Sequence, residues 1–278
     1  MKKTAPNKPL AKFPGRLVLL GAGKMGFAML EGWLARGLDP RKVIVIEPQP
    51  AKAVKALTRR GLKLNPTTPT EAAAIVIAVK PQAAPDALPA LGAYVGKNTL
   101  ALSIMAGRTL SFLADALPPN TPIVRAMPNT PASVGRGITV AAPNARASAR
   151  QRKQASDLLA AIGSVEWVTD EALMDAVTAL SGSGPAYVFL LAEAMAQAGV
   201  AAGLPPALAA RLARETVAGS GELLHRSALD AATLRQNVTS PGGTTAAALS
   251  VLMGPDGFGR LLAEAIAAAT RRSRELAG

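Results

Sequence analysis

Six residues near the start of the chain have the spacing of a phosphate-binding turn. Residues 21–26 read GAGKMG, a G-x-G-x-x-G pattern that follows the apolar run 17–20 and opens a helical window. In that setting Gly21 permits a tight turn, Gly23 lets the backbone approach a pyrophosphate, and Gly26 lets the helix lie close to the strand. The helix start supplies free N–H groups and a positive dipole end for the anion. The pattern therefore predicts a dinucleotide site.

Two further positions are candidates for binding the ribose groups of such a dinucleotide. Glu47 follows the apolar run 43–46. A carboxylate at this position can accept hydrogen bonds from the adenosine ribose, and it would repel a 2′-phosphate. This favours NADH over NADPH, although Lys24 or Lys52 can offset the repulsion. Residues 78–81 (AVKP) follow another apolar run, where a loop can pass under the nicotinamide ribose. The alternative for its lysine, Lys80, is an ordinary solvated side chain.

Two polar loops complete the candidate chemistry. Residues 125–131 (RAMPNTP) form a segment that two prolines make rigid, and we expect it at the same sheet edge as the glycine turn unless it is a plain turn. Residues 237–245 (NVTSPGGTT) precede an Ala-rich helical window, so their glycines and hydroxyls predict a helix start that binds a carboxylate. Simple capping of a structural helix is the alternative.

The composition limits the chemistry that side chains alone can perform. The 278 residues include no cysteine and one histidine, His225. A thiol nucleophile, an iron–sulfur cluster and zinc sites built on Cys or several His are therefore excluded, and we expect no metal site. We expect His225 to be a structural or surface residue and the chemistry to depend on a bound cofactor.

The formal net charge of +13 is the one feature that suggests nucleic-acid binding. More than half of it lies in two tails, because Lys2, Lys3, Lys8, Lys12 and Arg16 stand near one end and an arginine cluster near the other. Aromatic residues make up only 3% of the chain, too few for a base-stacking platform. We interpret the tails as solvated and expect no nucleic-acid partner.

The elements that must position these residues fall into two halves. Short apolar runs alternate with helical windows up to about residue 168, which predicts βαβ units and a mostly parallel sheet. The runs are residues 17–20, 43–46, 75–79, 99–103, 123–125, 138–141 and 165–168. The helical windows between them are residues 25–36, 51–60, 110–117 and 149–162.

Beyond residue 170 the pattern is helical almost throughout. We expect helices at residues 171–180, 185–197, 206–224, 231–238, 244–252 and 258–277, the first of them broken at residues 181–184 (SGSG). The fold class is therefore α/β: a disordered basic extension at 1–14, a Rossmann-type domain at 15–170, and an all-helical domain at 171–278. The helices are Ala-rich with few polar faces, so we expect them to pack against a second copy of the chain.

No stretch has the length and apolar character of a membrane span or a secretory signal. We therefore expect a cytoplasmic protein with no membrane partner.

Taken together, the motifs resemble pyrroline-5-carboxylate reductases over residues 16–269. The landmarks, in chain order, are residues 21–26 (GAGKMG), 78–82 (AVKPQ), 103–107 (SIMAG), 124–131 (VRAMPNTP), 181–187 (SGSGPAY) and 238–245 (VTSPGGTT). The first is shared by many dehydrogenases, whereas the last three are far more specific to this family.

The resemblance implies hydride transfer from NADPH or NADH to the C=N carbon of 1-pyrroline-5-carboxylate, giving L-proline. It also implies a homodimer with intertwined helical domains, often assembled further into a homodecamer. The substrate carboxylate would be held by the loop through backbone N–H groups of Gly242, Gly243 and Thr244, with the Thr245 hydroxyl near the ring nitrogen as the catalytic group. Members often prefer NADPH, whereas Glu47 favours NADH.

The resulting site assignment has two parts. The substrate-binding residues are Ser240, Gly242, Gly243, Thr244 and Thr245. The cofactor-binding residues are Gly21, Ala22, Gly23, Lys24, Met25, Gly26, Glu47, Ala78, Val79, Lys80, Pro81 and Asn129.

Three alternatives remain open on the residues. An imine reductase acting on other cyclic imines has the same architecture. A β-hydroxyacid-type dehydrogenase would present a catalytic lysine on the helical domain, but residues 172–258 contain no lysine. A dinucleotide-sensing nucleic-acid binder would need a recognition helix or stacking aromatics.

Overall fold

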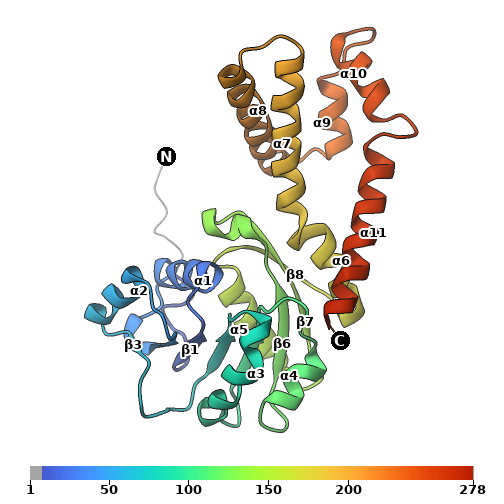
Figure 1. The fold of residues 1–278 in the computed structure, drawn as a ribbon. Helices are drawn as coiled ribbons and strands as arrows, with labels where there is room; N and C mark the ends of the chain where they lie inside the picture. Colours follow the sequence, from blue (N-terminus) through green and yellow to red (C-terminus); the bar gives the residue numbers. More distant parts are fainter. Residues whose placement is uncertain (1–7, 278) are drawn as a thin grey trace. The chain divides into compact units, whose positions relative to one another are not determined.

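The computed structural model describes residues 8–277 (Figure 1). Within them lies an eight-stranded sheet with the order β3-β2-β1-β4-β5-β6-β7-β8. The strands are β1 (Leu17–Leu20), β2 (Val43–Ile46), β3 (Lys63–Leu64), β4 (Ala74–Ile77), β5 (Leu100–Ser103), β6 (Ile123–Met127), β7 (Gly137–Pro143) and β8 (Gly163–Trp167).

The helices follow the predicted alternation and then the predicted helical run. They are α1 (Lys24–Ala35), α2 (Lys52–Leu57), α3 (Ala84–Ala87), α4 (Leu110–Ala116), α5 (Ala149–Leu159), α6 (Met174–Val177), α7 (Gly184–Ala201), α8 (Pro206–Arg226), α9 (Ala231–Asn237), α10 (Thr244–Leu252) and α11 (Phe258–Ala277). Within residues 8–277 no helix combines the length and the apolar character needed to span a bilayer.

Alternate residues of the central strands point to opposite faces, and both faces are covered. On one face Leu17 and Leu19 of β1 join the core cluster that contains Trp33 of α1 and Leu158 of α5. On the other face Val18 and its neighbours pack with residues of α3 and α4. Continuous apolar strands are needed because helices cover both sides, and each fully buried aliphatic side chain contributes roughly 1.5–3 kcal/mol to folding. The predicted α/β class is confirmed.

The predicted mostly parallel sheet is confirmed, with two details at its sides that the sequence does not predict. The two-residue strand β3 was not predicted, because Lys63 and Leu64 are too short a run to show a period. Strand β7 pairs antiparallel with β6, and β8 then pairs parallel with β7. The other neighbours pair in parallel, with β1 lying between β2 and β4. The order reverses at β1, which makes the carboxyl ends of β1 and β4 a switch point for ligand binding.

The predicted disordered extension at residues 1–14 differs from the structure in its described part, residues 8–14. Residues 1–7 of the expected disordered segment 1–14 lie outside the described residues. In the remainder, Leu10 and Phe13 are buried in the core, and Lys42 Nζ donates to the Phe13 carbonyl at 2.6 Å. The expectation of disorder is wrong for residues 8–14, because these two apolar side chains bind the segment to the first unit.

The chain divides into two compact units at Gly182 rather than at residue 170. The first contains the sheet together with the end of α11, from Thr270 onward, and the second spans residues 183–269. The reason is local: Ser273 Oγ donates to Asp175 Oδ1 at 2.7 Å, so the last turns of α11 belong with α6. The predicted break at residues 181–184 is instead a π-helical stretch, Thr178–Gly182, that runs into α7.

The second unit consists of helices with almost no core of their own. Among its described residues only Ala209 and Ala213 are buried, both on α8. The Cβ atom of a side chain at Gly199 would lie 3.2 Å from Ala209 Cβ, so α7 and α8 pack closely through small residues. Asp230 caps α9 by accepting from the Thr233 N–H at 2.7 Å, and this hydrogen bond lowers the pKa of Asp230.

Candidate functional site

The glycine turn after β1 is built as the pattern predicts. Gly21 has φ of +89°, a conformation that favours glycine, and a Cβ there would lie 2.8 Å from the Ala78 carbonyl oxygen. A Cβ at Gly26 would overlap the Gly21 carbonyl oxygen. The turn is therefore pressed against the end of β4 and against the start of α1, and both positions require glycine for steric reasons.

Gly23 differs from its two neighbours because the space beside it is open. It is the exposed N-cap residue of α1, and no atom lies within 4 Å of the position that its Cβ would occupy. The first hydrogen bond of the helix runs from the Phe27 N–H to the Gly23 carbonyl at 2.8 Å. The N–H groups of Lys24, Met25 and Gly26 therefore stand free at the helix start, beside the open space. A pyrophosphate fits this cradle by charge and by space.

Glu47 lies beside this turn, as predicted. Its Oε2 accepts a hydrogen bond from the Ala22 N–H at 2.9 Å, and its Oε1 accepts from the Gln49 N–H at 3.0 Å. Asn65 fixes the backbone here, because its side chain bonds both the N–H and the carbonyl of Glu47 at 2.8 and 2.9 Å. The carboxylate is thus held at the end of β2, where ribose hydroxyls are bound in dinucleotide enzymes.

The loop after β4 completes the first site. Ala78 and Val79 are half-buried against the glycine turn, whereas Lys80 is exposed at the N-cap of the short helix Pro81–Ala83. Arg108 holds this loop, since its Nη2 donates to the Pro81 carbonyl at 3.0 Å while its guanidinium lies over the Phe112 ring. Sequence reasoning missed Arg108, although it directly follows the landmark at residues 103–107.

The Asn129 side chain forms hydrogen bonds with other parts of the first unit. Its Oδ1 accepts from the Ile138 N–H at 3.0 Å, and its Nδ2 lies 3.4 Å from Ser181 Oγ in the π-helical stretch. Strand β6 extends to Met127, so residues 125–127 of the predicted loop belong to the strand, and only residues 128–131 follow its carboxyl end at the predicted sheet edge. The Asn129 amide connects that edge with the π-helix, a type of element that often marks functional sites.

Arg125, in the same segment, is buried and paired. Its Nη1 donates to Glu171 Oε1 at 2.8 Å, and the same carboxylate oxygen accepts from the Leu110 N–H at 2.7 Å. One acidic side chain therefore holds β6, the start of α4 and the segment that leads to α6. Sequence reasoning had not assigned a role to Glu171.

The predicted substrate loop belongs to the second unit. Gly242 has φ of +69°, and the Gly243 N–H donates to the Ser240 carbonyl at 3.1 Å, which closes a tight turn before α10. The turn thus uses the Gly243 N–H, one of the donors predicted for the substrate carboxylate. The Ala247 N–H bonds the Gly243 carbonyl, so the free donors of this helix start are those of residues 244–246.

The side chains of this loop are accessible. Ser240, Gly242 and Thr244 are exposed, and Thr245 is half-buried. His225 is exposed in the last turn of α8, as expected for a surface residue. The glycine turn, Glu47 and the loop after β4 thus lie together in the first unit, while the turn before α10 presents the free N–H groups of another helix start.

Comparisons with known proteins match both parts of the chain. The family described as "Pyrroline-5-carboxylate reductase dimerisation" matches residues 171–276, and that described as "NADP oxidoreductase coenzyme F420-dependent" matches residues 16–107. Pyrroline-5-carboxylate reductase of Pseudomonas aeruginosa is 39% identical and that of Synechocystis sp. 41% identical, each over 94% of this chain and at least 97% of its own.

Solved structures extend the likeness to three dimensions. A pyrroline-5-carboxylate reductase from Coxiella burnetii has a TM-score of 0.87 at 32% identity, over 95% of this chain and 99% of its own. The Plasmodium falciparum enzyme, solved with NADP bound, has a TM-score of 0.78 at 29% identity, again over 95% of this chain and 99% of its own.

The fold and the first site define a Rossmann-type oxidoreductase with a cradle for a nicotinamide dinucleotide. The identity to full-length relatives narrows this class further. The chain belongs to the pyrroline-5-carboxylate reductase family.

Proposed function

We propose that this protein reduces 1-pyrroline-5-carboxylate to L-proline, the last step of proline biosynthesis. The observation that carries the proposal is the pairing of two anion-binding helix starts in a member of this family. One is the open cradle at Gly23, and the other is the glycine turn before α10. The first suits a pyrophosphate and the second suits a small carboxylate substrate.

The residues have separate tasks in this reaction. Residues 21–26 hold the pyrophosphate, Glu47 accepts from the adenosine ribose, and the loop at residues 78–81 borders the nicotinamide end. A reduced nicotinamide held there supplies the hydride that adds to the C=N carbon. The N–H groups of residues 244–246 bind the substrate carboxylate, and the Thr245 hydroxyl hydrogen-bonds the ring nitrogen. A protonated imine is already electrophilic, so positioning is the main contribution of the protein.

NADH is the preferred donor in this proposal. The Glu47 carboxylate is fixed by two backbone N–H groups, at 2.9 and 3.0 Å, so it cannot swing away from a 2′-phosphate without losing both bonds. Lys24 is exposed at the helix start. Solvent and salt therefore screen its attraction for a 2′-phosphate, which offsets only part of the repulsion by Glu47. A fixed negative charge beside the ribose therefore disfavours NADPH.

The decisive experiment is a spectrophotometric assay with 1-pyrroline-5-carboxylate, comparing NADH and NADPH, with L-proline identified as the product. We expect a higher kcat/KM with NADH. The substitution Glu47→Gln keeps an oxygen for the Ala22 N–H but removes the charge, so it should raise the NADPH/NADH ratio of kcat/KM by about tenfold.

Two results would contradict these proposals separately. Absence of proline formation with either donor would contradict the activity itself. A wild-type preference for NADPH that Glu47→Gln leaves unchanged would contradict only the role of Glu47. A cyclic imine without a carboxylate serves as the control substrate and should react with a much higher KM.

We also infer that two copies associate through residues 183–269. This unit buries only two apolar side chains within one chain, yet it exposes many large ones. They include Val188, Phe189, Leu190, Leu212, Leu223, Val251, Leu261 and Leu262. A unit that exposes this many large apolar side chains is typical of one that packs against a partner. From the family resemblance we also expect such dimers to assemble into a decamer. A measurement of the molecular mass in solution tests both the dimer and the decamer.

A further inference from the structure

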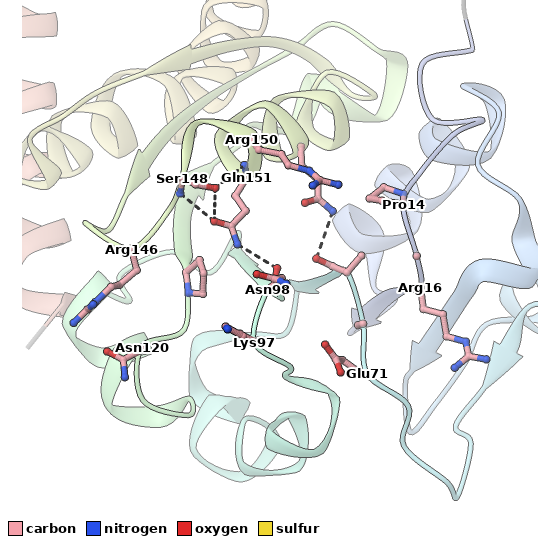
Figure 2. A pocket seen from close by; sticks show the side chains of 15 residues that line it. Pro14, Arg16, Glu71, Lys97, Asn98, Asn120, Arg146, Ser148, Arg150 and Gln151 are labelled. Atoms are coloured by element: carbon pink, nitrogen blue, oxygen red, sulfur yellow. Dashed lines mark hydrogen bonds between the residues drawn. The ribbon is translucent and has the colours of Figure 1, made fainter.

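A cavity lies at the end of the sheet opposite the glycine turn. It has a volume of about 640 Å³ and is bordered by residues that precede the strands: Arg16 before β1, Ala73 before β4, and Asn98 before β5 (Figure 2). The extended strand β1 separates Arg16 from Gly21 by about 16 Å. Ligands of open α/β sheets bind at the carboxyl ends of the strands, so the proposed reaction does not use this cavity.

The charge of the cavity is strongly positive. Arg16, Lys97, Arg146 and Arg150 stand around it, and Glu71 is the one acidic residue that lines it. None of the four cations forms an ion pair within the described part of the chain. Four positive charges against one negative leave a net charge of +3, so the cavity favours a ligand with several negative charges.

The walls that carry these cations are fixed by hydrogen bonds. Gln151 Nε2 donates to the Asn98 carbonyl at 3.1 Å, and Gln154 Nε2 lies 3.4 Å from the Ala73 carbonyl oxygen, so α5 is tied to two strand entries (Figure 2). The Ala73 N–H donates to the Arg16 carbonyl at 2.8 Å. The cavity therefore exists before a ligand arrives, and binding does not require the walls to be ordered.

We propose that this cavity binds a small polyphosphate anion, of the size and charge of triphosphate. Its volume is typical of small-molecule sites, roughly 300–1,000 Å³. Three of its cations are arginines, whose planar guanidinium groups match phosphate oxygens in pairs. Among the residues that line it there is no aromatic ring on which a nucleic-acid base would stack. A compact chain of linked phosphates satisfies the separated cations better than a single carboxylate.

The test is titration calorimetry of the protein with inorganic triphosphate, without and with saturating NAD⁺, which fills the dinucleotide cradle. The double variant Arg146→Gln/Arg150→Gln should bind triphosphate at least about tenfold more weakly than the wild type, because two charge-assisted contacts are lost. The matched control is Arg59→Gln/Arg60→Gln, which removes the same charge from two exposed residues outside the cavity. It should change the affinity by less than about twofold.

The outcomes separate a built site from general attraction of anions. Loss of affinity in the cavity variant alone, with unchanged melting temperature and unchanged proline formation, supports the proposal. Equal loss in both variants, no heat of binding with the wild type, or loss of triphosphate binding once NAD⁺ is present overturns it.

Two further ligands identify what is recognised. Equal affinity for ATP and triphosphate supports recognition of the phosphates alone, and tighter ATP binding supports an added nucleoside contact in the same cavity, provided that Arg146→Gln/Arg150→Gln weakens both. Preferential binding of a single-stranded oligonucleotide over triphosphate overturns the proposal in favour of a nucleic-acid surface.

Discussion

The three glycines of the first motif lack side chains for different reasons. Gly21 and Gly26 are constrained by the protein itself, because a Cβ at either position would meet backbone atoms of the turn or of the loop after β4. Gly23 has open space instead. Gly23 is therefore the position whose open space is available to a ligand. A side chain introduced at Gly23 should affect ligand binding without disturbing the fold.

The substitution Gly23→Val should abolish dinucleotide binding in a folded protein. The new side chain fits the empty protein but occupies the approach to the free N–H groups of α1. Loss of the glycine N-cap should lower stability by only about 1 kcal/mol. NADH fluorescence titration measures binding, and thermal unfolding measures the fold. A normal NADH titration of this variant would show that residues 21–26 are not the cradle.

Thr245 is the side chain that we assign to the substrate nitrogen. Thr245→Ala should lower kcat by about tenfold or more, the effect of losing one hydrogen bond to the reacting group. The dissociation constant for NADH should stay within about twofold. Thr245→Ser keeps the hydroxyl and should restore most of the rate. Ser250→Ala removes a hydroxyl from the same helix outside the loop and should leave kcat unchanged.

An equal loss of NADH affinity and turnover in Thr245→Ala would contradict this assignment. So would full activity of the alanine variant.

The elements were predictable wherever the apolar period was long enough to be read. Strands β1, β2, β4 and β5 are runs of apolar residues buried on both faces, and helices α5 and α8 have clear start signals. Strand β3 escaped because two residues, one of them Lys63, carry no period. The π-helical stretch escaped because Ser181 and Gly182 suggest a break in any local reading.

The remaining errors depend on contacts between residues distant in sequence. Residues 8–14 have a defined structure because Leu10 and Phe13 are buried in the core of the first unit. The local sequence of the segment does not reveal this burial. The cavity around Arg16 and Arg150 joins residues from five separate segments, and no spacing rule brings them together.

The ion pair and the hydrogen bond of Glu171 should contribute measurably to the free energy of unfolding of the first unit. Glu171→Ala leaves Arg125, whose side chain is only 5% exposed, without its partner and removes the acceptor for the Leu110 N–H. We expect a loss of about 2–3 kcal/mol in the free energy of unfolding, measured by urea titration. Glu171→Gln retains an acceptor oxygen and should lose less.

The control for this measurement is Asp157→Ala, which breaks the exposed pair with Lys153. It should cost no more than about 1 kcal/mol. If the Glu171 and Asp157 variants lose the same stability, the buried pair has no special structural role.

For the molecule as a whole, the missing core of residues 183–269 predicts its assembly. Phe189 is 67% exposed on α7 within one chain. Phe189→Lys should convert the dimer, or the decamer built from it, into smaller species, because a charge would be buried in an apolar interface. Light scattering after size-exclusion chromatography measures the mass.

Ala53→Lys adds the same charge to an exposed face of α2 in the first unit and should leave the mass unchanged. A wild-type protein that elutes as a monomer would contradict the assembly. The melting temperature of the wild type should also rise with protein concentration, as it does when association and folding are linked.

The return of α11 to the first unit has a consequence for how the protein is made. Ser273 follows its hydrogen-bond partner Asp175 by 98 residues, so it is synthesised well after that partner. The sheet can form on a nascent chain, but the contacts that residues from Thr270 onward make with the first unit form only once α11 has left the ribosome. A chain cut short before Thr270 would therefore lack packing contacts of the first unit, although every strand of its sheet ends by Trp167.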